Sequence, residues 1–199
     1  MSEDRGAERT RTRLRRDDRR RQLVGIGLQM LVDKPIQDLS LDDVAAEAGI
    51  SRGLLFHYFP TKSDYYDAVI GAALRRVLRN VSPDDGAGPD VALPQFVERY
   101  IAQIERRRDF YMALVFGKGT LAVGGEGVDT HRMAIARRIA TSLHLDEASL
   151  PIVHAWTAYV EDLALQWTAD DRQSRPHRDD VVAHACQVLH ALIGLDAPW

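Results

Sequence analysis

The chain has 199 residues, of which 45% are hydrophobic and 28% are charged, with a net charge of −3. This length suits one large or two small domains, and no uninterrupted apolar run reaches the roughly 18 residues of a membrane span. The single cysteine, Cys186, excludes an internal disulfide and a cysteine-rich metal site. Because the N-terminal segment lacks the apolar stretch of a signal peptide, we expect a cytoplasmic protein without a membrane partner.

Charge is distributed unevenly along the chain. Residues 1–62 carry 12 Lys/Arg and 10 Asp/Glu, whereas residues 63–199 carry 14 and 19. The first 24 residues contain nine arginines and five acidic residues. This asymmetry is typical of a chain that binds a polyanion at one end, but a solvated arginine-rich terminus has the same composition.

The apolar pattern predicts helices almost throughout, without the strict apolar–polar alternation of strands. An arginine-rich flexible arm over residues 1–12 precedes a first helix over residues 13–32. Pro35 ends this helix, because proline disfavours a helical residue before it and cannot donate a backbone hydrogen bond.

The segment from Ser40 to Tyr58 predicts two short helices joined by a tight turn. Ser40 and Asp43 form an S-x-x-D start signal, and Gly49 ends the first helix because glycine enters a left-handed turn at low cost. Ser51 can cap the second helix, which runs to about Tyr58. Two short helices around such a turn are the signature of a helix-turn-helix, whose second helix enters the DNA major groove.

The first residues of this second helix suit contacts with DNA. Arg52 can bond O6 and N7 of guanine with its planar fork, and Gly53 lets the backbone approach the bases beside Leu54. His57 and Tyr58 can donate to phosphate oxygens, which fix the register of a protein on the duplex.

The rest of the chain predicts further helices and a clear break at SPDDGAGPD. The expected ranges are residues 62–80, 93–107, 109–117, 129–143, 149–169 and 178–193.

The sequence SLDDVAAEAGISRGLLFHYFPTKSDYYDAVI resembles the DNA-binding domain of the tetracycline-repressor (TetR) family, and the likeness covers roughly residues 19–71. The family's spacing is matched at Ser40, Val44, Ala45, Ala48, Gly49, Ile50, Ser51, Gly53, Leu55, Phe59 and Lys62. The resemblance implies an all-α protein with a three-helix DNA-binding head over residues 13–61. It also implies a ligand-binding and dimerisation body of about six helices over residues 62–199.

The resemblance also implies roles for individual residues. Arg52 and Gly53 would contact bases of a double-stranded operator, next to Leu54. Phosphate contacts would come from Ser40, Ser51, His57, Tyr58 and Lys62. Family members usually have tyrosine where this chain has Phe56, so we expect a packing role for Phe56. We hypothesise that the arginine-rich arm adds backbone or minor-groove contacts.

For the body, the resemblance implies a homodimer that pairs the last two long helices and binds a palindromic operator. Apolar residues on both helices could instead close the core of one chain. An effector pocket would lie among the aromatic side chains Phe96, Tyr100, Phe110, Tyr111, Phe116, Trp156 and Tyr159. Glu161 and Asp162 interrupt an apolar helix and could face this pocket, pair across the dimer or face solvent.

The expected function is a ligand-responsive transcriptional regulator, most often a repressor in this family. A small helical enzyme or a protein-binding adaptor that retains the head is the alternative. The stretch GKGTLA from Gly117 matches a loose phosphate-binding pattern without a βαβ context, and the seven histidines show no H-E-x-x-H. We therefore expect no cofactor, no metal and no catalytic residue.

Overall fold

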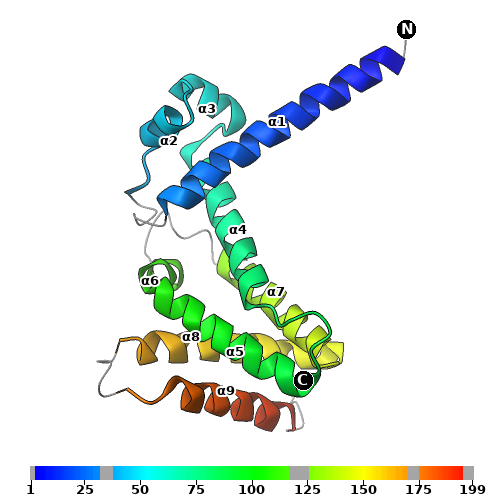
Figure 1. Ribbon diagram of the computed structural model, residues 1–199, viewed down its shortest axis with the longest axis vertical. Coiled ribbons are helices and arrows are strands. Elements are labelled where there is room, and N and C mark those ends of the chain that lie inside the picture. The colour runs from blue at the N-terminus through cyan, green and yellow to red at the C-terminus, as the bar shows by residue number, and fades with distance from the viewer. Residues whose placement is uncertain (1–2, 32–37, 117–125, 170–174, 195–199) are drawn as a thin grey trace. The chain divides into compact units, whose positions relative to one another are not determined.

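The computed structural model describes residues 3–31, 38–116, 126–169 and 175–194, and these are almost entirely helical, without a strand among them (Figure 1). This confirms the predicted all-α class. The chain divides into two compact units, Met1–Ala73 and Leu74–Trp199, and the division falls inside helix α4.

The N-terminal unit contains α1 (Glu3–Met30), α2 (Leu41–Glu47), α3 (Arg52–Tyr58) and the first part of α4 (Lys62–Val81). The helix α1 begins at Glu3, ten residues before the predicted start, because arginine and glutamate are good helix formers. Pro35 lies outside the described residues. The core of this unit buries Leu23, Leu39, Leu41, Val44, Leu55, Phe59, Tyr65, Tyr66, Val69 and Ile70.

A close approach between α1 and α4 holds this core together. A Cβ atom added at Gly27 would lie 2.5 Å from the Tyr65 hydroxyl and 2.7 Å from Cγ2 of Val69. That hydroxyl donates to the carbonyl of Leu23 over 2.8 Å, and burial raises the pKa of Tyr65, so it remains a donor. Glycine at position 27 is therefore required by packing.

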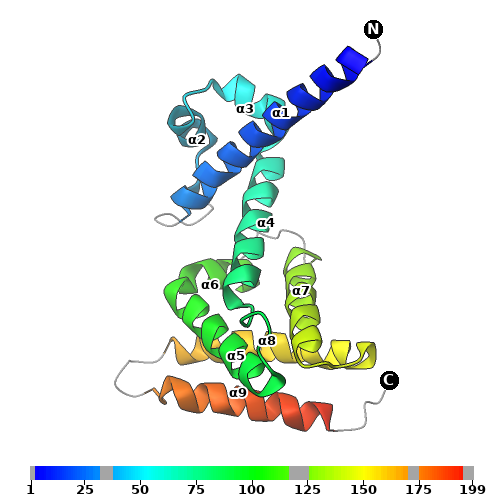
Figure 2. The same ribbon diagram turned by 45° about the vertical axis from the view of Figure 1, so that its right-hand side comes forward.

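The C-terminal unit contains the remaining helices (Figure 2). They are α5 (Pro89–Arg106), α6 (Arg108–Phe116), α7 (Glu126–Ser142), α8 (Leu150–Trp167) and α9 (Arg178–Ile193), with a 3₁₀ turn at Glu147–Ser149. The predicted ranges agree with these to within four residues at each end. The largest difference is the start of α5, where Pro89 takes the first helical position, which tolerates proline because that N–H needs no partner.

The helix α8 lies at the centre of this unit and packs against α5, α7 and α9. Trp156 is buried, and its indole Nε1 donates to the Ala185 carbonyl on α9 over 2.9 Å. On α9, Cys186 is also buried, and burial raises the pKa of its thiol to about 11. No described helix is both long and apolar enough to cross a membrane.

Two arginines before and at the start of α9 fasten it to α5. Arg175 donates to Glu105 over 2.6 Å, and Arg178 reaches the other carboxylate oxygen of the same residue. The guanidinium of Arg175 also stacks 3.9 Å from the ring centroid of Trp167. Burial raises the pKa of Glu105, but the two guanidinium groups outweigh it and leave the pKa below its usual value.

Candidate nucleic-acid interface

Two serine caps and one glycine set the geometry of α2 and α3. The Ser40 hydroxyl accepts from the backbone N–H groups of Asp42 and Asp43 over 3.2 and 3.4 Å, and the Ser51 hydroxyl accepts from Leu54 over 3.2 Å. Gly49 has a φ of +63°, in the left-handed region that glycine enters most easily. The predicted caps and turn are confirmed.

The inner side of α3 is anchored in the core of the N-terminal unit. Leu55 and Phe59 are each 1% exposed, and the Phe59 ring lies edge-on to Tyr65 with centroids 5.0 Å apart. The guanidinium of Arg20 on α1 covers Phe59 at 4.6 Å. These contacts fix the orientation of α3 and leave its opposite side open.

The open side of α3 carries the residues predicted to contact bases. Arg52 and Gly53 are exposed, and Leu54 is 41% exposed although it is apolar. A Cβ atom added at Gly53 would meet only the Ser51 hydroxyl, at 3.9 Å. The first residues of α3 thus expose a positively charged side chain, a backbone segment without a side chain and an apolar side chain on one accessible surface.

Arg52 is held in place by two contacts that the sequence analysis missed. Its Nη1 donates to both carboxylate oxygens of Asp42 on α2, over 3.1 and 3.0 Å. Its guanidinium also lies 5.6 Å from the ring centroid of Phe56. Nη2 and Nε remain for another acceptor, since arginine has five N–H donors in a planar fork. The two partners are ten positions apart in the sequence, so local residue patterns do not reveal this ion pair.

The residues predicted to contact phosphates lie around the same helix. His57 and Lys62 are exposed, and the ring of Tyr58 meets His57 edge-on at 5.5 Å. Lys62 places its ammonium group 5.0 Å from the Tyr66 ring, whose hydroxyl donates to the Leu39 carbonyl. The hydroxyls of Ser40 and Ser51 accept from backbone N–H groups as caps, which leaves each O–H proton free to donate.

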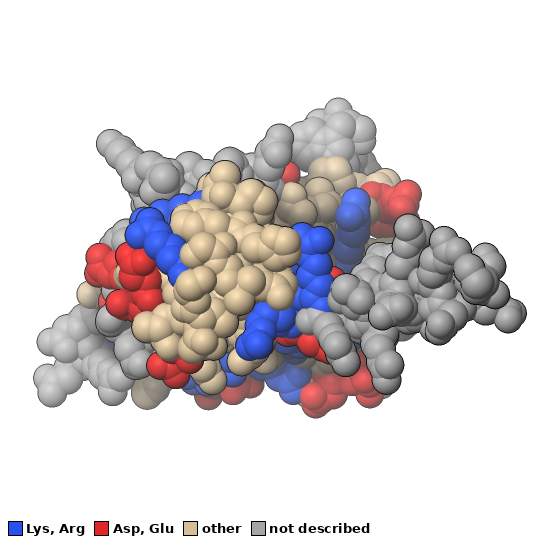
Figure 3. Space-filling model, turned by 90° about the horizontal axis from the view of Figure 1, so that it is seen from above, with Lys and Arg blue, Asp and Glu red and all other residues tan. Residues whose placement is uncertain are grey.

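The face seen in Figure 3 has a patch of uncharged side chains with lysine and arginine side chains on two sides, and acidic side chains also lie beside and below the patch. Basic side chains on two sides suit the two phosphate chains that flank a DNA groove.

The aromatic residues predicted to line a pocket lie in the C-terminal unit. Phe96, Tyr100, Tyr111 and Trp156 are buried in one core cluster, with Phe110 and Tyr159 partly buried against it. Neighbouring rings lie 5.4 Å apart for Phe96 and Tyr100 and 6.1 Å apart for Tyr100 and Tyr111. The side chain of Phe116 and the GKGTLA segment lie outside the described residues.

Of the three positions left open by its sequence, Glu161 does not face solvent and lies close to the predicted pocket residues Tyr100 and Tyr111. It is 1% exposed and pairs within the chain with Arg132 of α7, over 2.6 Å. Its neighbour Asp162 is exposed and accepts from Gln166 on the same helix.

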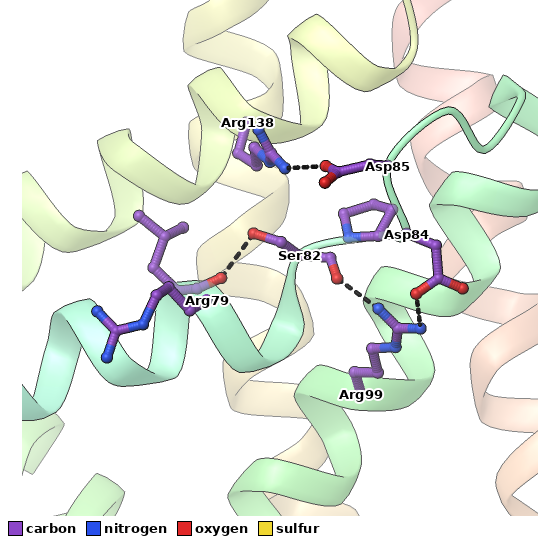
Figure 4. A pocket seen from close by; sticks show the side chains of 8 residues that line it. Arg79, Ser82, Asp84, Asp85, Arg99 and Arg138 are labelled. Atoms are coloured by element: carbon purple, nitrogen blue, oxygen red, sulfur yellow. Dashed lines mark hydrogen bonds and ion pairs between the residues drawn. The ribbon is translucent and has the colours of Figure 1, made fainter.

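A surface pocket of about 530 Å³ follows the end of α4 (Figure 4). Arg99 donates to the Asp84 carboxylate over 2.7 Å, and Arg138 approaches Asp85 at 3.4 Å. Hydrogen bonds from Arg99 and Gln95 lower the pKa of Asp84. These charged groups pair with one another, and the pairs connect the segment after α4 to α5 and α7. Among the described residues, no cluster of histidine, cysteine and acidic side chains could hold a metal ion.

The fold and the exposed, capped α3 define the class of protein: an all-α protein with a helix-turn-helix head. Residues 27–69 match the family model described as "Bacterial regulatory proteins, tetR family". The match confirms the predicted resemblance of the N-terminal unit to the DNA-binding region of this family.

Curated relatives match this head. A 62-residue stretch is 40% identical to the HTH-type transcriptional regulator EthR of Mycobacterium tuberculosis and covers 31% of this chain and 27% of EthR. A 65-residue stretch is 35% identical to the HTH-type transcriptional activator FasR of Mycolicibacterium smegmatis and covers 33% of this chain and 30% of FasR. The chain thus matches less than a third of the length of these relatives.

Solved structures match most of the chain. A tetR-family transcriptional regulator from Streptomyces coelicolor is 28% identical, with a TM-score of 0.69 over 89% of this chain and 81% of that one. A TetR transcriptional regulator from Rhodococcus sp. RHA1 is 15% identical and shares the fold, with a TM-score of 0.61 over 90% of this chain and 97% of that one.

Proposed function

We propose that this protein is a ligand-responsive transcriptional regulator that binds a palindromic operator as a homodimer and is released by a small molecule. The observation that carries the proposal is the tip of α3, where Arg52, Gly53 and Leu54 are exposed while Leu55 and Phe59 anchor the helix from behind. A helix held in this way can enter a major groove with its first residues toward the bases.

Specificity and affinity come from different residues in this proposal. Arg52 reads guanine, with its guanidinium oriented by Asp42, and Gly53 admits the DNA backbone or a base edge. Phosphate contacts come from Ser40, Ser51, His57, Tyr58 and Lys62 and set the register. Repression rather than activation is the commoner role in the family, and the two curated relatives are named a regulator and an activator.

A homodimer and an effector complete the proposal. Pairing of α8 and α9 with those of a second copy would place two recognition helices about 34–36 Å apart, one turn of DNA. An effector that binds the aromatic cluster of the body acts only if its affinity differs between the DNA-binding and the released conformation. A helical enzyme has less support, since the curated relatives are transcriptional regulators.

Selection of duplexes from a random library, followed by titration of two variants, tests the proposal. Arg52→Ala should cost about 1–3 kcal/mol on the selected duplex and relax the preference at one base pair in each half-site. Lys62→Ala should weaken all duplexes alike and reduce the salt dependence of binding. Unchanged selectivity in Arg52→Ala, or binding that does not respond to salt, would contradict the assignment and favour a protein-binding adaptor.

A further inference from the structure

Two buried tyrosines in the C-terminal unit pack their rings in the core but leave their hydroxyl groups unpaired among the described residues. Tyr100 on α5 and Tyr111 on α6 are each 0% exposed. Among the described residues, neither hydroxyl has a hydrogen-bond partner. A phenylalanine would fill each place without leaving a buried donor unpaired, and an unpaired buried hydroxyl lowers stability. The two hydroxyls therefore indicate an acceptor that is not part of the described chain.

The two hydroxyls share their surroundings with a buried ion pair. Glu161 on α8 accepts from Nε of Arg132 on α7 over 2.7 Å, and its side chain is 2% exposed. Burial raises the pKa of both phenols, and the nearby charge of Glu161 raises it further. Both tyrosines thus stay protonated as donors, and helices α5 to α8 each contribute one polar group to this cluster.

Apolar aromatic rings lie beside the first of these tyrosines. The Phe96 ring lies 5.4 Å from Tyr100 and 6.1 Å from Trp156, measured between centroids. Flat apolar molecules stack well against such rings. Aromatic rings together with two unpaired buried donors are the kind of lining that small-molecule sites commonly have.

The ion pair restricts the charge of a ligand. Glu161 and Arg132 neutralise each other, so an anion or a cation would enter without a partner or would have to break the pair. We propose that the C-terminal unit binds an uncharged, flat apolar molecule with a carbonyl-type oxygen, which accepts hydrogen bonds from Tyr100 and Tyr111. This inference rests on the proposed effector-responsive function and names the chemical class of the effector.

Calorimetric titration of the full chain with three probes tests the inference. Acetophenone carries the carbonyl, ethylbenzene has a similar size and shape without it, and benzoate adds a negative charge. Acetophenone should bind about fivefold or more tightly than ethylbenzene, the factor given by one neutral hydrogen bond. Benzoate should bind more weakly than both. Equal affinities of acetophenone and ethylbenzene, or binding of neither, would overturn the inference.

Variants then assign the preference to the two hydroxyls. In Tyr100→Phe/Tyr111→Phe, the ratio of the acetophenone and ethylbenzene affinities should fall to about one, while the melting temperature stays the same or rises. Thr157→Val is the matched control, because it removes a buried hydroxyl that already donates to the Val153 carbonyl on α8. This control variant should leave the ratio of the acetophenone and ethylbenzene affinities unchanged. A lower melting temperature with an unchanged ratio in the double variant would show that the hydroxyls are paired inside the protein.

A separate variant tests whether the ion pair excludes charged ligands. Glu161→Gln removes the negative partner of Arg132 and should raise the affinity for benzoate several-fold, while acetophenone changes little. Benzoate binding that does not change would contradict the role of the ion pair.

Parallel titration of DNA separates this inference from the proposed function. If the chain binds selected DNA but does not prefer acetophenone over ethylbenzene, the inference fails and the proposed function stands. If the chain binds acetophenone through both tyrosines but binds no DNA, the site stands and the proposed function fails.

Discussion

The space around Gly53 is large enough for a side chain, although the residue has none. Open space around the position means that packing of the free protein does not require glycine. Helix propensity even disfavours it, by about 1 kcal/mol relative to alanine. A reason for glycine must then lie in the complex with DNA, where a Cβ would separate the backbone from the duplex.

We therefore predict opposite effects of Gly53→Ala on stability and on DNA binding. Unfolding in urea should show a variant that is more stable by up to about 1 kcal/mol, and fluorescence anisotropy should show binding to the selected duplex that is about tenfold weaker or worse. Gly25→Ala on α1 is the control, since its added Cβ also meets open space. It should stabilise the protein without weakening DNA binding. Equal DNA affinity of Gly53→Ala and the native protein would rule out a close approach at this position.

Asp42 is predicted to determine selectivity through Arg52. Both side chains are more than half exposed, so the pair adds about 0–1 kcal/mol to stability and serves mainly to orient the guanidinium. In Asp42→Asn, the ratio of affinities for selected and random duplexes should fall about fivefold or more. Binding to random duplexes should strengthen, because a negative charge near the phosphates is removed.

A charge-matched variant separates these two effects. Glu47→Gln removes a negative charge from the same helix without touching Arg52, so the affinity ratio should stay unchanged. If both variants behave alike, the charge of α2 matters and the orientation of Arg52 does not.

Among the elements, α2 and α3 were predicted well because their signals are local. Ser40, Gly49 and Ser51 act on backbone groups within three residues, so their spacing alone determines where each helix begins and ends. Long-range pairs were not predicted. The pair of Asp42 and Arg52 and the pair of Arg132 and Glu161 depend on how helices pack, which residue patterns do not encode.

The packing of α1 on α4 gives a prediction for a second glycine. In Gly27→Ala, the new Cβ would overlap the Tyr65 hydroxyl and Val69 and force the helices apart. We expect a loss of about 1–3 kcal/mol in the free energy of unfolding, even though alanine favours the helix. Gly25→Ala, two residues away, should stabilise the protein. A Gly27→Ala variant as stable as the native protein would show that α1 and α4 are not in contact.

The attachment of α9 to α5 should weaken in acid. The pKa of Glu105 lies below its usual value of 4.5 in the folded chain, so its ion pairs stabilise the fold above that pH and are lost as the pH falls further. The difference in unfolding free energy between the native protein and Glu105→Gln should be full at neutral pH and shrink below about pH 4. A difference that stays constant from pH 7 to pH 3 would exclude this contribution.

For the whole molecule, the central prediction concerns the proposed dimer. The helices α8 and α9 pack side by side and keep partly exposed apolar residues, among them Ile152, Leu163, Val188 and Leu192 (Figures 1 and 2). Ala191 is exposed on α9 and small enough to allow two helices to approach closely. These features favour pairing of two copies through this surface.

A glutamate at this surface should prevent pairing without unfolding the chain. Light scattering should find Ala191→Glu as a monomer at concentrations where the native protein is a dimer. Its affinity for a two-half-site duplex should fall about a hundredfold, because the second head is no longer linked to the first. Ala148→Glu, an exposed change in the 3₁₀ turn, should leave both properties unchanged. A dimeric Ala191→Glu variant would place the interface elsewhere.

Because the thiol of Cys186 is buried, spectroscopic probes can be attached to an introduced cysteine while the native cysteine is kept. Because burial raises the pKa of this thiol to about 11 and the residue belongs to the core cluster of the C-terminal unit, it should not react with maleimides at neutral pH. An introduced thiol, such as Glu47→Cys on the exposed side of α2, would then be the site of labelling without removal of the native cysteine. Spin or fluorescence labels on two copies could thus report the separation of their heads, with and without acetophenone, in a background that needs no further substitution.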